Sequence, residues 1–240
     1  MIEGPFSEDY FWYDESESDP EFLDHWDDTL SAQSSDDWGW DEWGDLVVFR
    51  PVGYSPRYQY PLIVWLSLDA VPGVTLRDWF PDLSDRNYIG AEIRLSADLT
   101  ISQNADRVAI AIREIVALYG IHMRRIWVAG TGSAADAVLQ MLPALSRLVA
   151  GGVAITPAEL DAADPYSSLG LSGKTLYIAT ETGAATEAAE CLQEEWEIHD
   201  ADCHLTEWDS IDATRLAICR DLNAWLMQQV CAPAGHDSRG

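Results

Sequence analysis

The fold is decided by the segment Arg124-Arg-Ile-Trp-Val-Ala-Gly-Thr-Gly-Ser-Ala-Ala-Asp-Ala-Val-Leu-Gln-Met141. Residues 126–129 form a short apolar run with β-branched and aromatic side chains, which predicts a buried strand. The glycines of Gly130-Thr-Gly132 predict a sharp turn, and Ser133 is a suitable helix N-cap. The small residues that follow predict a helix able to lie close to a sheet. The segment therefore predicts a strand, a glycine turn and a helix in direct succession.

Strands and helices alternate on both sides of this segment. Further strands are predicted at 46–51, 60–67, 88–95, 151–156, 174–180 and 203–208. Further helices are predicted at 75–84, 104–119 (with Asn104 as N-cap), 186–196 and 212–230. In the helix 104–119, helical spacing places four apolar residues on one face: Val108, Ile112, Ile115 and Leu118. The alternation favours an α/β domain over residues 46–230 with a doubly wound, mostly parallel sheet, followed by a tail at 231–240.

A strand, a glycine turn and a small-residue helix form the arrangement called the nucleophile elbow. The run resembles the phospholipase/carboxylesterase and dienelactone-hydrolase branch of the α/β-hydrolases, where it reads hydrophobic-Ala-Gly-x-Ser-x-Gly-Gly. The resemblance extends over about residues 46–230 and is strongest at 61–67, 124–141 and 215–227. It implies an α/β-hydrolase fold, in which hydrolysis needs a nucleophile, a base histidine, an orienting acid and an oxyanion hole.

The four catalytic places that the resemblance implies are all altered in this chain. Alignment of the elbow puts the nucleophile at Gly132, and the orienting acid falls at Gly183 or Ala184. The base histidine falls at Asp212, and the Leu-His-Gly of the oxyanion loop is replaced by Leu66-Ser67-Leu68. The resemblance thus implies a hydrolase scaffold with its triad positions vacated.

The interpretation we favour is a catalytically inactive α/β-hydrolase-fold protein that acts by binding. A small ligand in the vacated pocket would contact Ser67, Leu68, Gly132 and Ser133. One alternative is an active serine esterase that uses Ser133 in a degenerate elbow, although none of the five histidines directly precedes the closing helix. A second alternative is a structural or scaffold subunit.

Charge divides the chain into two zones. The whole chain has 41 acidic and 14 basic residues and a net charge of −27, which disfavours nucleic acid and anionic membranes as partners. Residues 1–45 hold sixteen of the acids and ten aromatic residues, and they predict an acidic aromatic arm. This arm either folds on a protein partner or packs back on its own domain. The first case predicts a partner with a basic, partly apolar surface, contacted by Trp38, Trp40 and Trp43. The acidic composition also fits an adaptation to high salt.

Neither a cofactor nor a metal is predicted. The four cysteines have no zinc-like spacing and are predicted to be free thiols in a reducing cytoplasm. The run His199-Asp-Ala-Asp-Cys-His204 is typical of a helix-to-strand turn. The glycines at 130 and 132 lack the lysine of a P-loop. Without an apolar leader or a membrane-length apolar run, the sequence favours a cytoplasmic protein.

Overall fold

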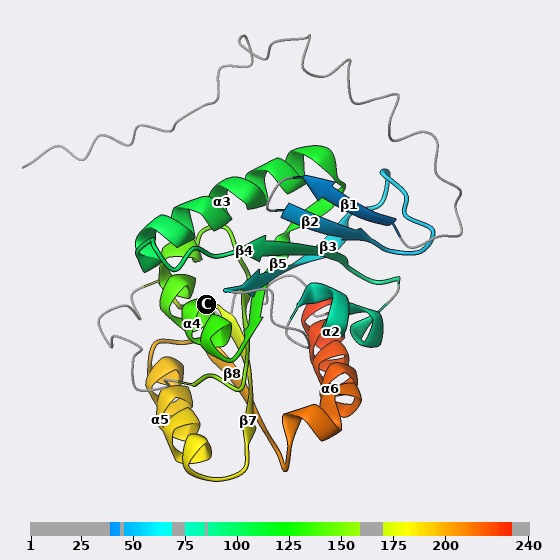
Figure 1. The fold of residues 1–240 in the computed structure, drawn as a ribbon. Coiled ribbons are helices and arrows are strands. Elements are labelled where there is room, and N and C mark those ends of the chain that lie inside the picture. The colour runs from blue at the N-terminus through cyan, green and yellow to red at the C-terminus, as the bar shows by residue number, and fades with distance from the viewer. Residues whose placement is uncertain (1–38, 44–45, 69–74, 85, 159–169, 232–240) are drawn as a thin grey trace, which may run out of the picture. The chain divides into compact units, whose positions relative to one another are not determined.

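The computed structural model describes residues 39–43, 46–68, 75–84, 86–158 and 170–231 (Figure 1). The chain divides into two units, Met1–Asp37 and Trp38–Gly240, and every described residue belongs to the second. Most of the predicted N-terminal arm and almost all of the tail 231–240 lie outside the described residues.

The second unit is built on an eight-stranded sheet in the order β1-β2-β4-β3-β5-β6-β7-β8. The strands β1 and β2, and likewise β2 and β4, pair antiparallel, whereas all the other neighbours are parallel. The predicted α/β class with a mostly parallel, doubly wound sheet is therefore confirmed. The strands are β1 (Gly39–Trp43), β2 (Leu46–Arg50), β3 (Tyr60–Ser67), β4 (Ile89–Arg94), β5 (Ile121–Thr131), β6 (Gly151–Ile155), β7 (Thr175–Glu181) and β8 (Asp202–Trp208).

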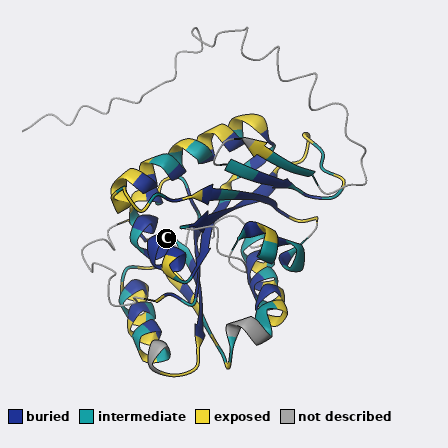
Figure 2. Cartoon of the chain, in the orientation of Figure 1, coloured by how far each residue is buried: buried dark blue, intermediate teal, exposed yellow. Residues whose placement is uncertain are grey.

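Helices cover both faces of the sheet (Figure 1). One face packs against α3 (Ile101–Leu118), α4 (Ser133–Leu145) and α5 (Ala184–Ile198), and the other against α2 (Leu76–Leu83) and α6 (Ile211–Cys231). The sheet is dark blue through its centre in Figure 2, while the outward sides of these helices are exposed. Among the described residues, no helix combines the length and the apolar character that crossing a membrane requires.

The central strand β3 shows why the sequence pattern predicted it well. All eight of its residues are buried, because parallel strands covered on both faces need a continuous apolar run. Alternate residues serve the two cores: Val64 packs on the side of α3 and α4, and Trp65 packs on the side of α2 and α6.

The predicted details of helix α3 need two corrections. Its N-cap is Thr100 rather than Asn104, because Thr100 and Gln103 form a reciprocal capping box. Asn104 is buried in the first turn and hydrogen-bonds both the backbone N–H and the carbonyl of Ser96. Leu118 is 40% exposed, although the other three residues of the predicted apolar face are buried.

The sheet starts before the boundary that the sequence predicted after residue 45. Strand β1 pairs with β2 and is tied to the domain through Asp41. The carboxylate of Asp41 lies 2.8 Å from the guanidinium Nε of Arg50 and accepts a 2.8 Å hydrogen bond from the hydroxyl of Tyr119. Trp40 packs edge-on against Phe49, with ring centroids 5.2 Å apart. Residues 39–43 therefore belong to the domain and not to the arm.

Candidate functional site

The turn between β5 and α4 has the sharp geometry of an elbow. Strand β5 ends at Thr131, and Gly132 then adopts φ +56° and ψ −131° before the helix starts at Ser133. The N–H of Gly132 donates to the carbonyl of Ile155 (2.9 Å), and its own carbonyl accepts from the N–H of Ala135 (2.9 Å). Gly132 is therefore the N-cap, and the prediction of that role for Ser133 is wrong. Ser133 is the first helical residue and is exposed.

Gly130 allows the helix to pass close to the strand. A β-carbon at this position would lie 2.7 Å from the carbonyl oxygen of Ala134, in the first turn of α4. A β-carbon at Gly132 would meet no described atom within 4 Å. The two glycines therefore serve different needs, since one provides space and the other provides a positive φ angle.

The topology brings the four predicted catalytic places to one edge of the sheet. Positions 67–68, 132, 183 and 212 lie at or just after the carboxyl ends of β3, β5, β7 and β8, which are parallel strands. Gly183 is exposed and is the N-cap of α5, with φ +137°. Asp212 lies in the first turn of α6, and its side chain is outside the described part. Leu68 is half-buried. Ligands of open α/β sheets bind at this edge.

Three buried hydroxyl groups lie at the carboxyl ends of β3, β5 and β7, at this edge of the sheet. The side-chain oxygens of Ser67, Thr131 and Thr180 are buried and have no hydrogen-bond partner among the described residues. Because Trp65 pairs with Ala129, the register brings Ser67 and Thr131 side by side two residues further along. Both then point to the α2 and α6 side, and Thr180 points to the opposite side. Only Ser67 was predicted as a site residue; a polar residue ending an apolar strand was the signal for the other two.

The described histidines lie away from the elbow. His122 is at the amino end of β5, and His199 is the C-cap of α5, so both are at the opposite edge. His204 is on β8, three strands from β5, which is about 14 Å at the usual strand spacing. Its ring stacks on Tyr177, and its Nε2 lies 3.8 Å from a carboxylate oxygen of Asp221.

The remaining candidate residues do not form a further centre within the described chain. Cys203 is buried and His204 exposed, and no group of three or more His, Cys, Asp or Glu residues lies close enough to hold a metal. The four cysteines are free thiols, and burial raises the pKa of Cys203 and of Cys219 to about 12. Of the predicted partner contacts, Trp38 and the side chain of Trp43 fall outside the described part, and Trp40 packs on the domain.

Solved esterase structures share this architecture. One of two fungal esterases from Rhizomucor miehei superimposes with a TM-score of 0.60 at 13% identity, covering 91% of this chain and 93% of the esterase. This is the α/β-hydrolase fold. An esterase of the bacterial hormone-sensitive lipase family gives a TM-score of 0.59 at 17% identity, covering 85% of this chain and 89% of that one. A Pyrobaculum calidifontis esterase gives 0.60 at 13% identity, with 78% and 82% covered. No protein-family model and no curated protein matches the sequence.

Proposed function

We propose that this α/β-hydrolase-fold protein works by binding and does not hydrolyse esters. The observation that carries the proposal is the glycine at the strained turn between β5 and α4. In active members of the fold, this turn presents a serine nucleophile, and the strain of the backbone is what exposes its hydroxyl. Gly132 has the positive φ angle of such a turn but offers no nucleophilic atom.

The neighbouring positions support the same conclusion. The place of the orienting acid after β7 is Gly183, which has no side chain. The place of the base before the closing helix is Asp212, and a carboxylate cannot replace histidine as a base near pH 7 without a large rise in its pKa. Ser133 is exposed one residue beyond the turn, and among the described residues no histidine lies beside it to activate its hydroxyl.

The same edge of the sheet suits a small polar ligand. Buried hydroxyls without partners cost free energy, so a site that retains two of them side by side favours a ligand that satisfies them. Ser67 and Thr131 are 2% and 8% exposed and offer two donors and several acceptor lone pairs to such a ligand. This ligand would be neutral or weakly charged, because the hydroxyls carry no charge of their own.

The protein partner of this proposal would engage residues 1–37. These residues hold thirteen acids and seven aromatics and not a single Lys or Arg. Flanking acids steer a chain toward a basic surface, and aromatic side chains supply contact area at low entropy cost. Trp40 is no longer proposed as a partner contact, because its ring packs against Phe49 in the sheet.

Hydrolysis is tested with the full chain, short acyl esters and a serine-reactive fluorophosphonate probe. We expect that the probe does not label the chain and that ester turnover does not exceed that of the Ser133→Ala variant. If Ser133 is not a nucleophile, replacing it by alanine removes no reactive group, so the two proteins should behave alike. Turnover that disappears in Ser133→Ala, with an unchanged circular dichroism spectrum, would establish the alternative, an esterase with a displaced nucleophile.

Partner binding is tested by capture from a lysate with the full chain and with residues 38–240. We expect a basic protein that only the full chain retains and that is released as salt rises, since screening weakens charge steering. If both chains retain the same protein equally, the interface lies on residues 38–240 and not on residues 1–37, and this result would favour the scaffold alternative.

A further inference from the structure

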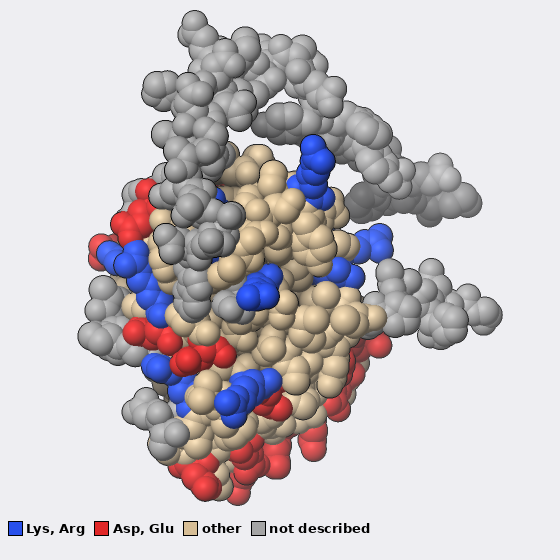
Figure 3. Space-filling model, turned by 90° about the vertical axis from the view of Figure 1, so that its right-hand side faces the viewer, with Lys and Arg blue, Asp and Glu red and all other residues tan. Residues whose placement is uncertain are grey.

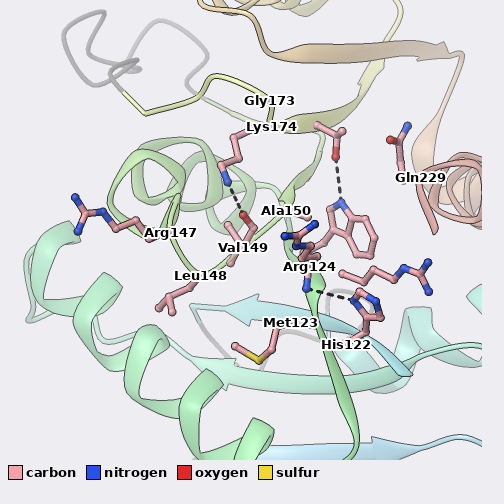
Figure 4. Close-up of a pocket in the computed structure, with 13 residues that line it drawn as sticks. His122, Met123, Arg124, Arg147, Leu148, Val149, Ala150, Gly173, Lys174 and Gln229 are labelled. Atoms are coloured by element: carbon pink, nitrogen blue, oxygen red, sulfur yellow. Dashed lines mark hydrogen bonds between the residues drawn. The ribbon is translucent and has the colours of Figure 1, made fainter. Parts of the chain in front are cut away.

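A group of basic residues lies at the edge of the sheet opposite the elbow. A cavity of about 490 Å³ is bounded by the first half of β5, the connection from α4 to β6, the start of β7 and the end of α6 (Figure 4). Four of the 14 basic residues of the chain line it, and no Asp or Glu of the part that the structure describes does. The four are Arg124, Arg125, Arg147 and Lys174, with His122 beside them.

This grouping contrasts with the surface elsewhere. On the face shown in Figure 3, many acidic side chains gather toward the lower edge, and both acidic and basic side chains lie on the left side. Three arginines outside the cavity, Arg50, Arg77 and Arg215, have carboxylate partners. Within the described residues, none of the four cavity cations forms an ion pair with a carboxylate. In a chain of net charge −27, a cavity lined by four cations and by no described Asp or Glu creates a local positive field.

Both cationic and apolar side chains line the cavity. Lys174 is half-buried, and its ammonium donates a 3.0 Å hydrogen bond to the carbonyl of Val149, which leaves two of its three donor positions for other acceptors. The indole N–H of Trp127 donates to the hydroxyl of Thr175 (3.2 Å), which fixes a wall of the cavity. Arg147 extends away from the other labelled side chains (Figure 4).

Helix termini explain only part of this arrangement. Helices α4 and α6 both end at this edge, and cations stabilise the partial negative charge of helix C-termini. Arg147 lies two residues beyond the end of α4, where its positive charge can stabilise the C-terminus of that helix. Arg124 and Arg125 are on strand β5, however, and Lys174 directly precedes β7, so a helix terminus does not account for those three.

We propose that this cavity binds a phosphate-bearing small molecule. Guanidinium groups pair with phosphate oxygens through two parallel hydrogen bonds, and Lys adds a point charge. The volume exceeds that of a free phosphate and lies in the range of small-molecule sites. The apolar atoms of Met123, Leu148 and Trp127 provide contact for an organic group attached to the phosphate.

A macromolecular polyanion fits this cavity less well. Nucleic acid and anionic membranes present extended negative surfaces, so they would meet the acidic remainder of the chain as well as the cavity. A small anion avoids this repulsion, because at physiological salt a charge is screened beyond about 8 Å. The cavity is also a local hollow rather than a stripe of basic residues along one face.

Isothermal titration of the full chain with sodium pyrophosphate tests the proposal. We expect saturable binding with one site per chain, weakened about tenfold in Arg124→Gln, since one charge-assisted contact is lost. Lys174→Gln should weaken it similarly. The control is Arg113→Gln, which removes the same charge from the exposed face of α3 and should leave the affinity within a factor of about two.

Two results would overturn the proposal. The first is the absence of saturable heat up to millimolar pyrophosphate, or equal weakening in the Arg113→Gln control. The second is tighter binding of a DNA duplex or of phosphatidylserine vesicles than of pyrophosphate, with the same sensitivity to Arg124→Gln. Because Arg124 is exposed, its replacement leaves the buried core intact, and a circular dichroism spectrum of the variant verifies this.

Discussion

Replacing each glycine of the elbow by alanine separates the two roles that the structure gives them. At Gly132, the added methyl group would meet no described atom within 4 Å, so its cost is that of the backbone alone. Sparsely populated conformations cost about 1–3 kcal/mol for a residue with a β-carbon. Alanine also lowers the conformational entropy of the unfolded chain, and this effect raises the free energy of unfolding by about 0.4–1 kcal/mol. We therefore expect Gly132→Ala to lower the free energy of unfolding by about 1–2 kcal/mol.

At Gly130, the cost is steric. The added methyl group would lie 2.7 Å and 2.8 Å from the carbonyl oxygen and carbon of Ala134, and both atoms belong to the backbone of α4. Overpacking of this kind costs about 1–3 kcal/mol or more, and here the helix itself must shift. We expect Gly130→Ala to lower the free energy of unfolding by about 3 kcal/mol, clearly more than Gly132→Ala does.

Urea unfolding followed by circular dichroism measures both variants. With a slope of about 2.5 kcal/mol per molar urea, a difference of 1 kcal/mol moves the midpoint by about 0.4 M. Gly132→Ser should resemble Gly132→Ala in stability and should gain no esterase activity. The reasoning is refuted if Gly132→Ala is the more destabilised of the two alanine variants, or if Gly132→Ser alone hydrolyses esters.

Three further outcomes are expected. Deleting residues 1–37 should leave the melting temperature of the domain nearly unchanged, while deleting 1–45 should lower it by several degrees, because the second deletion removes β1 and Asp41; equal temperatures would contradict this. Asp41→Ala should cost about 3 kcal/mol in urea unfolding, since it removes the carboxylate that lies 2.8 Å from the mostly buried guanidinium of Arg50, and a loss below 1 kcal/mol would argue against that. From pH 9 to 10 the free energy of unfolding should fall as pH rises, because burial raises the pKa of the Cys219 thiol to about 12 and the folded state keeps this proton after the unfolded state has lost it. Cys219→Ala should reduce this slope by up to about 1.4 kcal/mol per pH unit, and an unchanged slope would contradict the prediction.

The order of strands and helices could be predicted because it depends on local pattern. Strand β3 matches its prediction at both ends, since a strand buried on both faces needs a continuous apolar run. Helix α3 shows where pattern misled, because Asn104 is a good cap by residue type. The pair Thr100 and Gln103 has the spacing of a capping box and begins the helix earlier.

Contacts between distant parts of the chain were harder to predict. The acidic and aromatic composition of the first 45 residues hid strand β1, because Asp41 reads as one more acid of an arm until Arg50 and Tyr119 are placed around it. The cationic cavity was likewise invisible, since Arg124 and Arg125 are neighbours in sequence but Lys174 meets them only through the sheet. The elbow was the exception, because strand, turn and helix follow one another directly.

Lys174 is the only lysine in the chain, and it lines the cationic cavity. Amine-selective acylating reagents therefore have one side chain to modify, besides the α-amino group. Burial lowers the pKa of the Lys174 ammonium, which increases the fraction of reactive free amine near neutral pH. Acylation of Lys174 therefore reports on the cavity without any substitution in the chain. The rate at which the peptide that contains Lys174 becomes acylated should fall when a ligand occupies the cavity.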